Sequence, residues 1–538
     1  MVFARRSTTL LAAIIASCAM VLSLTACTSD NKTVVDGQTT VTSNSAGGVA
    51  VFTPSDGITL NQQTPLNKWA KLVPDLAKAL ADAGFKKGDI NHTTSDSLDK
   101  QSRAIQDFVV DHLSNNTTDD SGIAIAPDNM TLLVAPVVEA DASTRQYGDY
   151  VSQNLSTNDV TDEGATSDGE SSEDDSSNTE SDSTASDEQA QAVDRLVSSL
   201  KLAKESGMHV VLLGNSIEGY KPDAFVKFSD AQTIGKLQAE KMVSKLKLDK
   251  ASKDNPKYIE VLLPYTAMDE KGNANDSTFA QEAFRGIWQV LGSYYQKGVV
   301  ESPSGTLDGK STENDWQAVA YDAAKEGSTA KVLDKRLAKT DGQSTLTRID
   351  GIITMNDYIA SEVVKELDDL GYTGSAADIN PQITISGIVG NITGKKDLSR
   401  DAVPDPIKSP ENDNANDSSS SDDDADEDTS ASDKDRDSQW PLVTGYGAYV
   451  SNIPSIVNGK QWMTGMEDRQ TIATDIAQAC AKLNKDEALN SMPSIRNSEV
   501  GGVKKIPTIS EPLLAVSASN LKSALIDPGY ISLADAGL

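Results

Sequence analysis

The feature that most constrains the fold is a regular alternation of short apolar runs with longer amphipathic segments. Apolar runs such as 131–135 and 209–213 predict buried strands. Segments with apolar residues every three or four positions, such as 231–246, predict helices. Strands that alternate with helices in this way form parallel sheets covered by helices on both faces. We therefore expect an α/β protein with doubly wound parallel sheets.

The predicted elements run through most of the chain. The strands share a short, mainly aliphatic composition and are expected at 48–52, 131–135, 209–213, 258–263 and 350–354. The helices share an amphipathic period and are expected at 66–83, 191–205, 231–246, 279–295 and 358–370. This order of elements is typical of a sheet whose strands are joined by crossover helices.

Two acidic runs interrupt the alternation. Residues 156–190 contain twelve acidic residues and no basic one, and residues 411–437 contain twelve acidic and two basic residues. Most of the formal net charge of −32 therefore lies in these runs. Their few aliphatic side chains cannot bury enough apolar surface to offset the entropy of ordering. We predict two disordered acidic inserts, at 156–190 and 404–438.

The remaining chain is long enough for two domains of ordinary size. The net charge argues against nucleic acid as a partner, because the chain has 80 acidic residues and only 48 basic ones. Binding to phosphates requires clustered Lys and Arg side chains. No such cluster is evident in the sequence.

The first residues have the pattern of an export signal. Arg5 and Arg6 precede the apolar stretch 10–24, which is shorter than the ~20 residues of a spanning helix. The stretch ends in Leu24-Thr-Ala-Cys27, which resembles the lipobox of bacterial lipoproteins, where the Cys sulfur receives the lipid. We predict a signal peptide at 1–26, a lipid on Cys27 and a polar tether at 27–47, with the protein anchored on the extracytoplasmic face of the cell membrane. The alternative is an ordinary secretory signal in which Cys27 is incidental.

The positions of the cysteines and histidines indicate that neither a disulfide nor a metal site is expected. With Cys18 in the signal and Cys27 lipidated, only Cys480 remains, so no disulfide is expected. Cys480 lies in an apolar helical pattern, which favours a buried thiol over a nucleophile. The three histidines are not spaced as metal ligands, so neither a metal nor another cofactor is expected.

A nucleophile motif is incomplete in this chain. Gly214-Asn-Ser216-Ile-Glu218 nearly matches the turn that carries the serine of α/β-hydrolases, but Glu218 replaces the second glycine. We therefore do not expect an enzyme.

In parallel sheets, ligands bind beyond the carboxyl ends of the strands. The segments that directly follow predicted strands are 136–138, 214–216, 264–266, 355–357 and 445–447. Asn356 and Asp357 form the most polar of these ends, and we expect them at the mouth of a sheet. An alternative interpretation makes Asp357 the N-cap of the helix that follows.

Three blocks, in their order along the chain, resemble a known family. They are the segment that leads into Gly235-Lys-Leu-Gln-Ala239, the strand end Thr354-Met-Asn-Asp357, and the tail 506–530 with its proline, strand and helix. They resemble the sugar-binding proteins of ABC importers with the type I periplasmic-binding fold, closest to the xylose-binding branch. The resemblance implies two α/β lobes joined by a hinge of crossing segments, with the ligand held between them.

The resemblance also divides the chain. It implies that residues 48–225 form mainly lobe 1 and residues 226–440 mainly lobe 2. Residues 441–538 would supply the hinge crossings and the C-terminal elements shared by both lobes.

Several binding positions of the family carry over one by one. Lys68 and Trp69 match a basic residue followed by Trp, which would offer a donor and an aromatic face to a sugar ring. Asn356 matches the Asn of the lobe-two strand end. Gly214 and Asn215 stand where xylose-type members have Asp-Arg, so the guanidinium fork that grips hydroxyls is lost.

The hinge strand of lobe two has two possible alignments. If it is 443–449, Tyr446 and Gly447 replace the Gln-Asp pair of the family. If it is 383–387, Ile388 and Val389 take those places. Neither alignment restores the carboxylate, so we expect a pocket that is more aromatic and less charged than that of a pentose binder.

Taken together, these patterns predict an extracytoplasmic solute-binding lipoprotein that closes around a small ligand, with a sugar as the expected class, and delivers it to an ABC permease. The residues expected in the pocket are Lys68, Trp69, Asn215, Asn356, Asp357 and Tyr446. Two alternatives remain open. One is a lipoprotein that reports a ligand to a membrane kinase, and the other is a surface interaction protein with a vestigial cleft.

Overall fold

The computed structural model describes residues 46–55, 65–115, 125–138, 144–156, 180–268, 275–338, 345–376 and 439–538. The predicted signal peptide, Cys27, most of the tether, the insert at 404–438 and the alternative hinge strand at 383–387 lie outside these ranges. Within them, no helix is both long enough and apolar enough to cross a membrane.

The first lobe is built on a seven-stranded sheet of order β15-β16-β7-β5-β3-β1-β2. Its neighbouring strands are parallel except for the antiparallel pair β15 and β16. The bounds are β1 (Gly48–Pro54), β2 (Ile90–Ser95), β3 (Met130–Val134), β5 (His209–Leu213), β7 (Ala224–Lys227), β15 (Ile495–Val500) and β16 (Val503–Ser510).

The register of this sheet explains why its central strands are apolar throughout. Val51, Leu133 and Val211 pair across β1, β3 and β5 and belong to one hydrophobic cluster. The residue that precedes each of them belongs to a different cluster on the opposite face. Because side chains alternate along a strand, both faces must be apolar when both are covered by helices.

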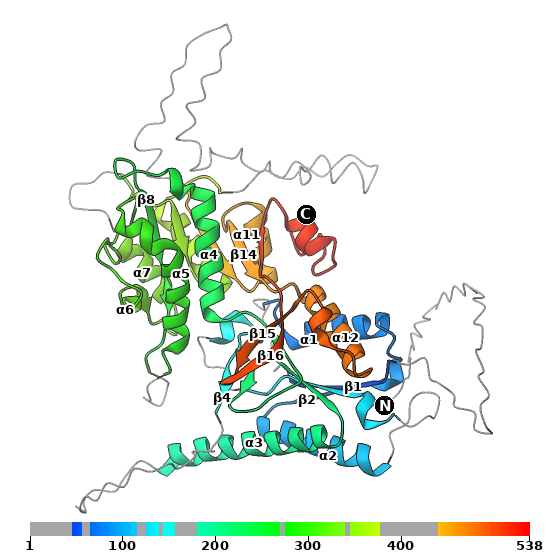
Figure 1. The fold of residues 1–538 in the computed structure, drawn as a ribbon. Coiled ribbons are helices and arrows are strands. Elements are labelled where there is room, and N and C mark those ends of the chain that lie inside the picture. The colour runs from blue at the N-terminus through cyan, green and yellow to red at the C-terminus, as the bar shows by residue number, and fades with distance from the viewer. Residues whose placement is uncertain are drawn as a thin grey trace, which may run out of the picture. The chain divides into compact units, whose positions relative to one another are not determined.

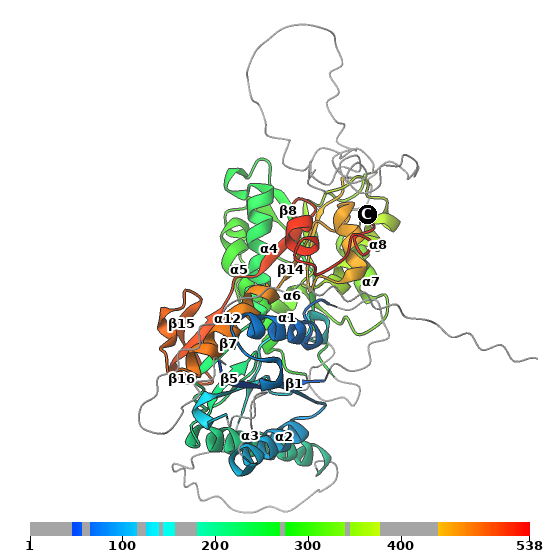
Figure 2. The ribbon, with the colours of Figure 1, turned by 90° about the vertical axis from the view of Figure 1, so that its right-hand side faces the viewer.

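Two pairs of helices cover these faces (Figures 1 and 2). On one face, α1 (Trp69–Asp82) packs beside α12 (Arg469–Leu483). On the other, α2 (Leu98–Asn115) packs beside α3 (Glu180–Glu205). Thus α12, from the late part of the chain, completes a layer that the early part begins.

The second lobe is built on a six-stranded sheet of order β10-β8-β12-β13-β14-β17, in which only β17 is antiparallel to its neighbour. The bounds are β8 (Lys257–Val261), β10 (Val300–Glu301), β12 (Gly351–Ile353), β13 (Leu442–Tyr446), β14 (Met463–Met466) and β17 (Leu514–Ser517). Its main helices are α4 (Ala231–Leu246), α5 (Thr278–Gln296), α7 (Ser328–Arg336) and α8 (Asp357–Leu370).

Glycines allow the helices of the second lobe to approach closely. A Cβ atom on Gly235 of α4 would lie 2.2 Å from the carbonyl oxygen of Ala283 in α5. A Cβ atom on Gly286 of α5 would lie 2.0 Å from the carbonyl oxygen of Gln232. Since real Cβ contacts are not this short, α4 and α5 can pack at this distance only because both positions lack a side chain.

Within the described ranges, three connections run between the two sheets. The chain leaves the first sheet after β7 and enters α4, returns from β14 to α12, and crosses again from β16 to β17. The prediction of an α/β protein with two doubly wound parallel-sheet lobes joined by crossing segments is confirmed.

One predicted boundary is wrong. The acidic insert was expected at 156–190, but α3 begins at Glu180, so its last residues are helical. Acidic residues favour the first turns of a helix, where unpaired N–H groups carry partial positive charge, and this preference competes with the solvation that favours disorder. Residues 157–179 lie outside the described ranges.

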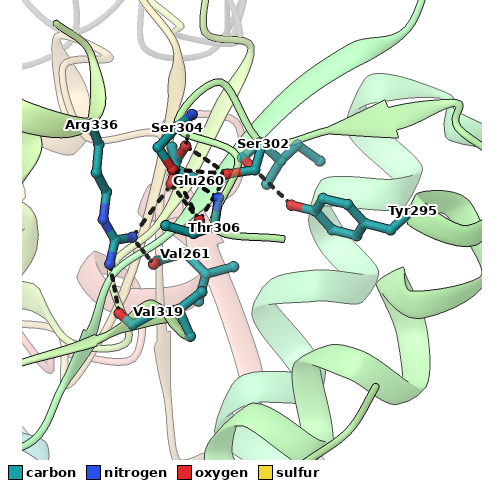
Figure 3. A network of polar contacts seen from close by, with 9 residues as sticks. Glu260, Val261, Tyr295, Ser302, Ser304, Thr306, Val319 and Arg336 are labelled. Carbon is teal, nitrogen blue, oxygen red and sulfur yellow. Dashed lines mark hydrogen bonds and ion pairs between the residues drawn. The ribbon is translucent and has the colours of Figure 1, made fainter. Parts of the chain in front are cut away.

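A buried ion pair joins α7 to β8, the second strand from one edge of the second sheet (Figure 3). Glu260 of β8 accepts hydrogen bonds from Ser302 Oγ at 2.7 Å and from the N–H of Ser304 at 2.8 Å. Arg336, the last residue of α7, lies 3.4 Å from Glu260 and donates to the carbonyl oxygen of Val261 at 2.5 Å. Because these charged groups find their partners inside the lobe, we assign this network to folding rather than to ligand binding.

Candidate functional site

Residues at or beyond the carboxyl ends of strands contact residues of the other lobe directly. Tyr446, the last residue of β13, has its hydroxyl 2.5 Å from Ser229 Oγ, which follows β7. Asn356, after β12, donates through Nδ2 to Gln146 Oε1 at 3.1 Å. Gln146 lies between β3 and β5 of the first lobe. We call this contact region, formed by residues 65–69, 144–153, 228–229, 355–357, 446–449 and 464–467, the interlobe junction.

Lys68 and Trp69 are held by one carboxylate. Lys68 Nζ lies 2.7 Å from Asp149 Oδ1, and the N–H of Trp69 donates to Asp149 Oδ2 at 3.0 Å. The Trp69 side chain is only 3% exposed and meets the rings of Tyr150 and Phe228 edge-on, with centroids 5.1 and 5.7 Å away. Its faces are therefore covered by the protein itself.

Asn215 has a partner at each end of its amide. Its Oδ1 accepts from the N–H of Gln153 at 3.0 Å, and its Nδ2 donates to the carbonyl oxygen of Pro136 at 2.9 Å. The side chain is buried. Asn215 thus ties the segment after β5 to the segment after β3.

Asn356 is the N-cap of α8. Its Oδ1 accepts from the N–H of Ile359 at 2.9 Å, which satisfies one of the free donors of the first turn. The alternative interpretation of Asp357 as the N-cap is therefore wrong, because Asp357 is already the first helical residue. Capping uses only Oδ1, which leaves Nδ2 of Asn356 to face the first lobe.

Asp357 lies in a fully buried network of the second lobe. Its Oδ1 accepts from Gln461 Nε2 at 2.7 Å, and its Oδ2 accepts from the N–H of Tyr449 at 2.9 Å and from Thr464 Oγ1 at 2.8 Å. Desolvation raises the pKa of Asp357 to about 6, although these hydrogen bonds oppose the rise. The carboxylate fixes the ends of β13 and β14 relative to α8.

Tyr446 belongs to a polar cluster that joins two crossing segments. Glu467, after β14, accepts from the N–H of Ser229 at 2.7 Å, and the Tyr446 hydroxyl lies 3.4 Å from the same oxygen. Burial raises the pKa of Glu467 to about 7 and also raises that of Tyr446. Glu467 was missed in the sequence because Met463-Thr-Gly-Met466 is too short and mixed to predict a strand before it.

Gln146 and Tyr147 were also missed. The Tyr147 side chain is 1% exposed, and its ring centroid lies 4.7 Å from that of Phe279 and 6.3 Å from that of Tyr446. The carbonyl oxygen of Gln146 accepts from the Tyr449 hydroxyl at 2.6 Å. Neither residue directly follows a strand, so the strand-end rule did not point to them.

Five of the six predicted residues lie in the interlobe junction, and the sixth, Asn215, contacts the junction through Gln153. Lys68, Trp69 and Asn215 lie on the side of the first lobe, and Asn356, Asp357 and Tyr446 on that of the second. The segment 144–153 contacts members of both groups. Aromatic rings, amides and hydroxyls at a meeting point of two lobes are suited to binding an uncharged polar molecule.

A cavity of about 700 Å³ lies elsewhere, at the amino-terminal ends of β5 and β7. Its lining includes His209, Asp223 and Arg496. Because ligands of parallel sheets bind at the carboxyl ends of the strands, the interlobe junction is the better candidate.

No family model and no curated protein matches the sequence. Three solved structures with similar folds illustrate what the chain is similar to. An ABC transporter solute-binding protein from Clostridium phytofermentans with bound β-D-glucose is 17% identical, with a TM-score of 0.44, and 91% of this chain and 99% of that chain are covered.

A carbohydrate transporter solute-binding protein from Chloroflexus aurantiacus in complex with D-glucose is also 17% identical, with a TM-score of 0.43 over 92% of this chain and 98% of that one. A periplasmic ribose ABC transporter from Conexibacter woesei is 14% identical, with a TM-score of 0.43 over 90% of this chain and 96% of that one.

Proposed function

We propose that this chain is an extracytoplasmic solute-binding lipoprotein of an ABC importer. It binds a small carbohydrate between its two lobes and presents it to a membrane permease. The observation that carries the proposal is that the strand ends of two parallel sheets meet at the interlobe junction, beside the segments that connect the lobes. Ligands of such sheets bind at this edge.

The mechanism is closure of the lobes around the solute. A solute that contacts both sides of the junction stabilises the closed arrangement by its differential affinity for that arrangement. The connecting segments are short, since only a few residues separate Lys227 from Ala231 and Met466 from Arg469. Changes in their backbone angles can therefore rotate one lobe relative to the other.

The chemistry of the junction favours an uncharged ring with hydroxyl groups. Asn356 and Tyr449 supply an amide and a hydroxyl donor on the side of the second lobe. Phe279 and Tyr446 supply aromatic rings near them. Aromatic faces stack on sugar rings, and amide and hydroxyl groups pair with sugar hydroxyls.

Replacement of Asn356 by alanine tests the site. Titration calorimetry with a panel of pentoses and hexoses is expected to give binding with the native chain and about 5- to 150-fold weaker binding with Asn356→Ala, because a lost hydrogen bond in a buried site costs about 1 to 3 kcal/mol. The dissociation constant is the appropriate measure, since loss of the cap alone lowers stability by about 1 kcal/mol.

Asn314→Ala is the matched control. Asn314 is exposed and lies in the second lobe away from the junction, so its replacement should leave sugar binding unchanged. If no sugar of the panel binds the native chain, the carbohydrate proposal is refuted. Equal binding by both variants would refute the assignment of Asn356 to the site.

A further inference from the structure

We propose that residues 144–155 form a strap, whose tip, Gln146 and Tyr147, holds the two lobes together and competes with solute for the interlobe junction. The proposed competition with solute depends on the function proposed above. The proposal that the strap holds the two lobes together does not depend on that function. The strap is a part of the first lobe that reaches into the second.

The base of the strap is fixed to the first lobe. The N–H of Asp149 donates to the carbonyl oxygen of Asn67 at 2.8 Å, and the Asp149 carboxylate pairs with Lys68. The Tyr150 ring stacks on that of Phe228 with centroids 4.8 Å apart. Further along, β4 (Asn154–Leu155) pairs with β6 (Ser216–Ile217), which follows β5.

The tip of the strap belongs to the second lobe by its contacts. Tyr147 and Val151 are members of the hydrophobic core of the second lobe, whereas Tyr150 is a member of that of the first. Gln146 accepts hydrogen bonds from both Asn356 and Tyr449. One short segment thus contributes apolar side chains to two cores, which is what a clasp between two bodies requires.

The tip uses the groups that a solute would need. Its Tyr147 ring lies against Phe279 and Tyr446, and its Gln146 oxygens take the donors of Asn356 and Tyr449. A sugar that stacks on these rings and accepts from these donors must displace the tip. Strap and solute are therefore alternative occupants of one surface.

The junction also retains hydrogen-bonding capacity away from the tip, at Asn67 and in the base of the strap. Among the described residues, Asn67 Nδ2 and Ser152 Oγ are buried and have no hydrogen-bond partner. A buried polar atom without a partner costs about 1 to 3 kcal/mol. A solute hydroxyl group that forms a hydrogen bond with either atom therefore recovers part of the free energy that is lost when the tip is displaced.

A distance measurement between the lobes tests the strap without any ligand. Spin labels are placed at Gln106→Cys on α2 and Gln289→Cys on α5, two exposed positions on different lobes. The measurement uses the full chain with Cys18→Ser and Cys27→Ser, and the remaining cysteine, Cys480, is fully buried and should not be labelled. Double electron–electron resonance then reports the distribution of distances between the lobes.

The native strap is expected to give one narrow, short distance without added sugar. Gln146→Ala with Tyr147→Ala is expected to add a population at longer distance. Phe279→Ala, which removes the facing ring from a partly buried position of the second lobe, should have the same effect if the double variant does not fold. Asn154→Ala, whose side chain contacts Ser216 of the first lobe, is the matched control and should keep the native distribution.

If the distances are unchanged in both the tip variant and Phe279→Ala, the proposal that the strap holds the lobes together is refuted. For the competition, the sugars that bind the native chain are titrated into the tip variant, or into Gln146→Ala alone if the double variant does not fold. A severalfold lower dissociation constant is expected, because the state that can bind solute is more populated without the tip contacts. If that variant binds the sugar more weakly than the native chain does, the proposed competition is refuted, and the replaced side chain is one that contacts the solute. If no sugar binds either protein, the carbohydrate function fails while the distances still decide the strap.

Discussion

At the scale of single residues, the most informative groups are carboxyls buried between the lobes. Glu467 is 1% exposed and lies on the second crossing, and it binds Ser229 on the first. A carboxyl in this position is easier to bury neutral than charged. The connection between the two crossings is therefore sensitive to pH.

Glu467→Gln is expected to remove a pH dependence of stability. Burial raises the pKa of Glu467 from its ordinary 4.5 to about 7, so the folded state holds its proton more tightly than the unfolded state. The associated stability is fully present below pH 4.5 and is lost as pH rises to about 7, by up to about 3 kcal/mol. Urea unfolding of native chain and variant between pH 4.5 and 8 measures this difference.

Glu218→Gln serves as the matched control, because Glu218 is exposed. It should leave the native pH profile unchanged. The assignment to Glu467 fails if Glu467→Gln loses stability with rising pH as steeply as the native chain does.

At the scale of secondary structure, the sequence predicts long periodic elements well. The strand predicted at 209–213 and the helix predicted at 231–246 match β5 and α4 residue for residue. The edge strand β2 was missed, since its Asn91-His-Thr-Thr94 run is exposed and polar. A strand that is buried on both faces has a continuous apolar sequence that is easy to recognise. An edge strand exposed to solvent does not require apolar residues.

The site was only partly predictable for a related reason. Asn356 follows a predicted strand, and the family resemblance implies that Asn356 and Tyr446 line a pocket between the lobes, so both could be placed near the first lobe. The partners Gln146 and Ser229 could not, because they lie in irregular segments whose paths depend on tertiary packing. No periodicity marks such residues.

The Glu260 network gives an element-scale prediction. Glu260→Gln and Arg336→Met each break a buried ion pair between β8 and α7, and each is expected to lower the free energy of unfolding by about 3 to 5 kcal/mol, because one charge stays buried without its partner. The double variant should lose less than the sum, since it leaves neither charge behind. Chemical denaturation of the three variants measures the coupling.

An exposed pair offers the comparison. Lys482 and Glu487 lie 3.0 Å apart with side chains 29% and 52% exposed, so Glu487→Gln should cost less than about 1 kcal/mol. Equal losses at Glu260 and Glu487, or strictly additive losses at Glu260 and Arg336, would contradict a structural role for the buried pair.

At the scale of the whole molecule, the proposed lipid anchor governs where the lobes work. Cys27 follows an apolar stretch and small residues in the order of a lipobox. Cys27→Ser is expected to abolish labelling by radioactive palmitate and to release the protein from the membrane fraction into the medium or periplasm. Fractionation and autoradiography of cells that express each form test this prediction.

Cys480→Ser controls for the loss of any thiol, since Cys480 is fully buried in α12. It should leave labelling unchanged. If Cys27→Ser stays in the membrane fraction and is labelled as strongly as the native chain, the lipid anchor is refuted. The function of the lobes must then be explained without an anchor.

The three crossings also determine when the protein can fold during its synthesis. The first sheet starts with β1 at Gly48 but places β16, which ends at Ser510, next to β7. The amino-terminal lobe is therefore incomplete until nearly the whole chain has left the ribosome. A chain that cannot complete its first lobe early stays unfolded for longer, which suits the export that we propose for this protein.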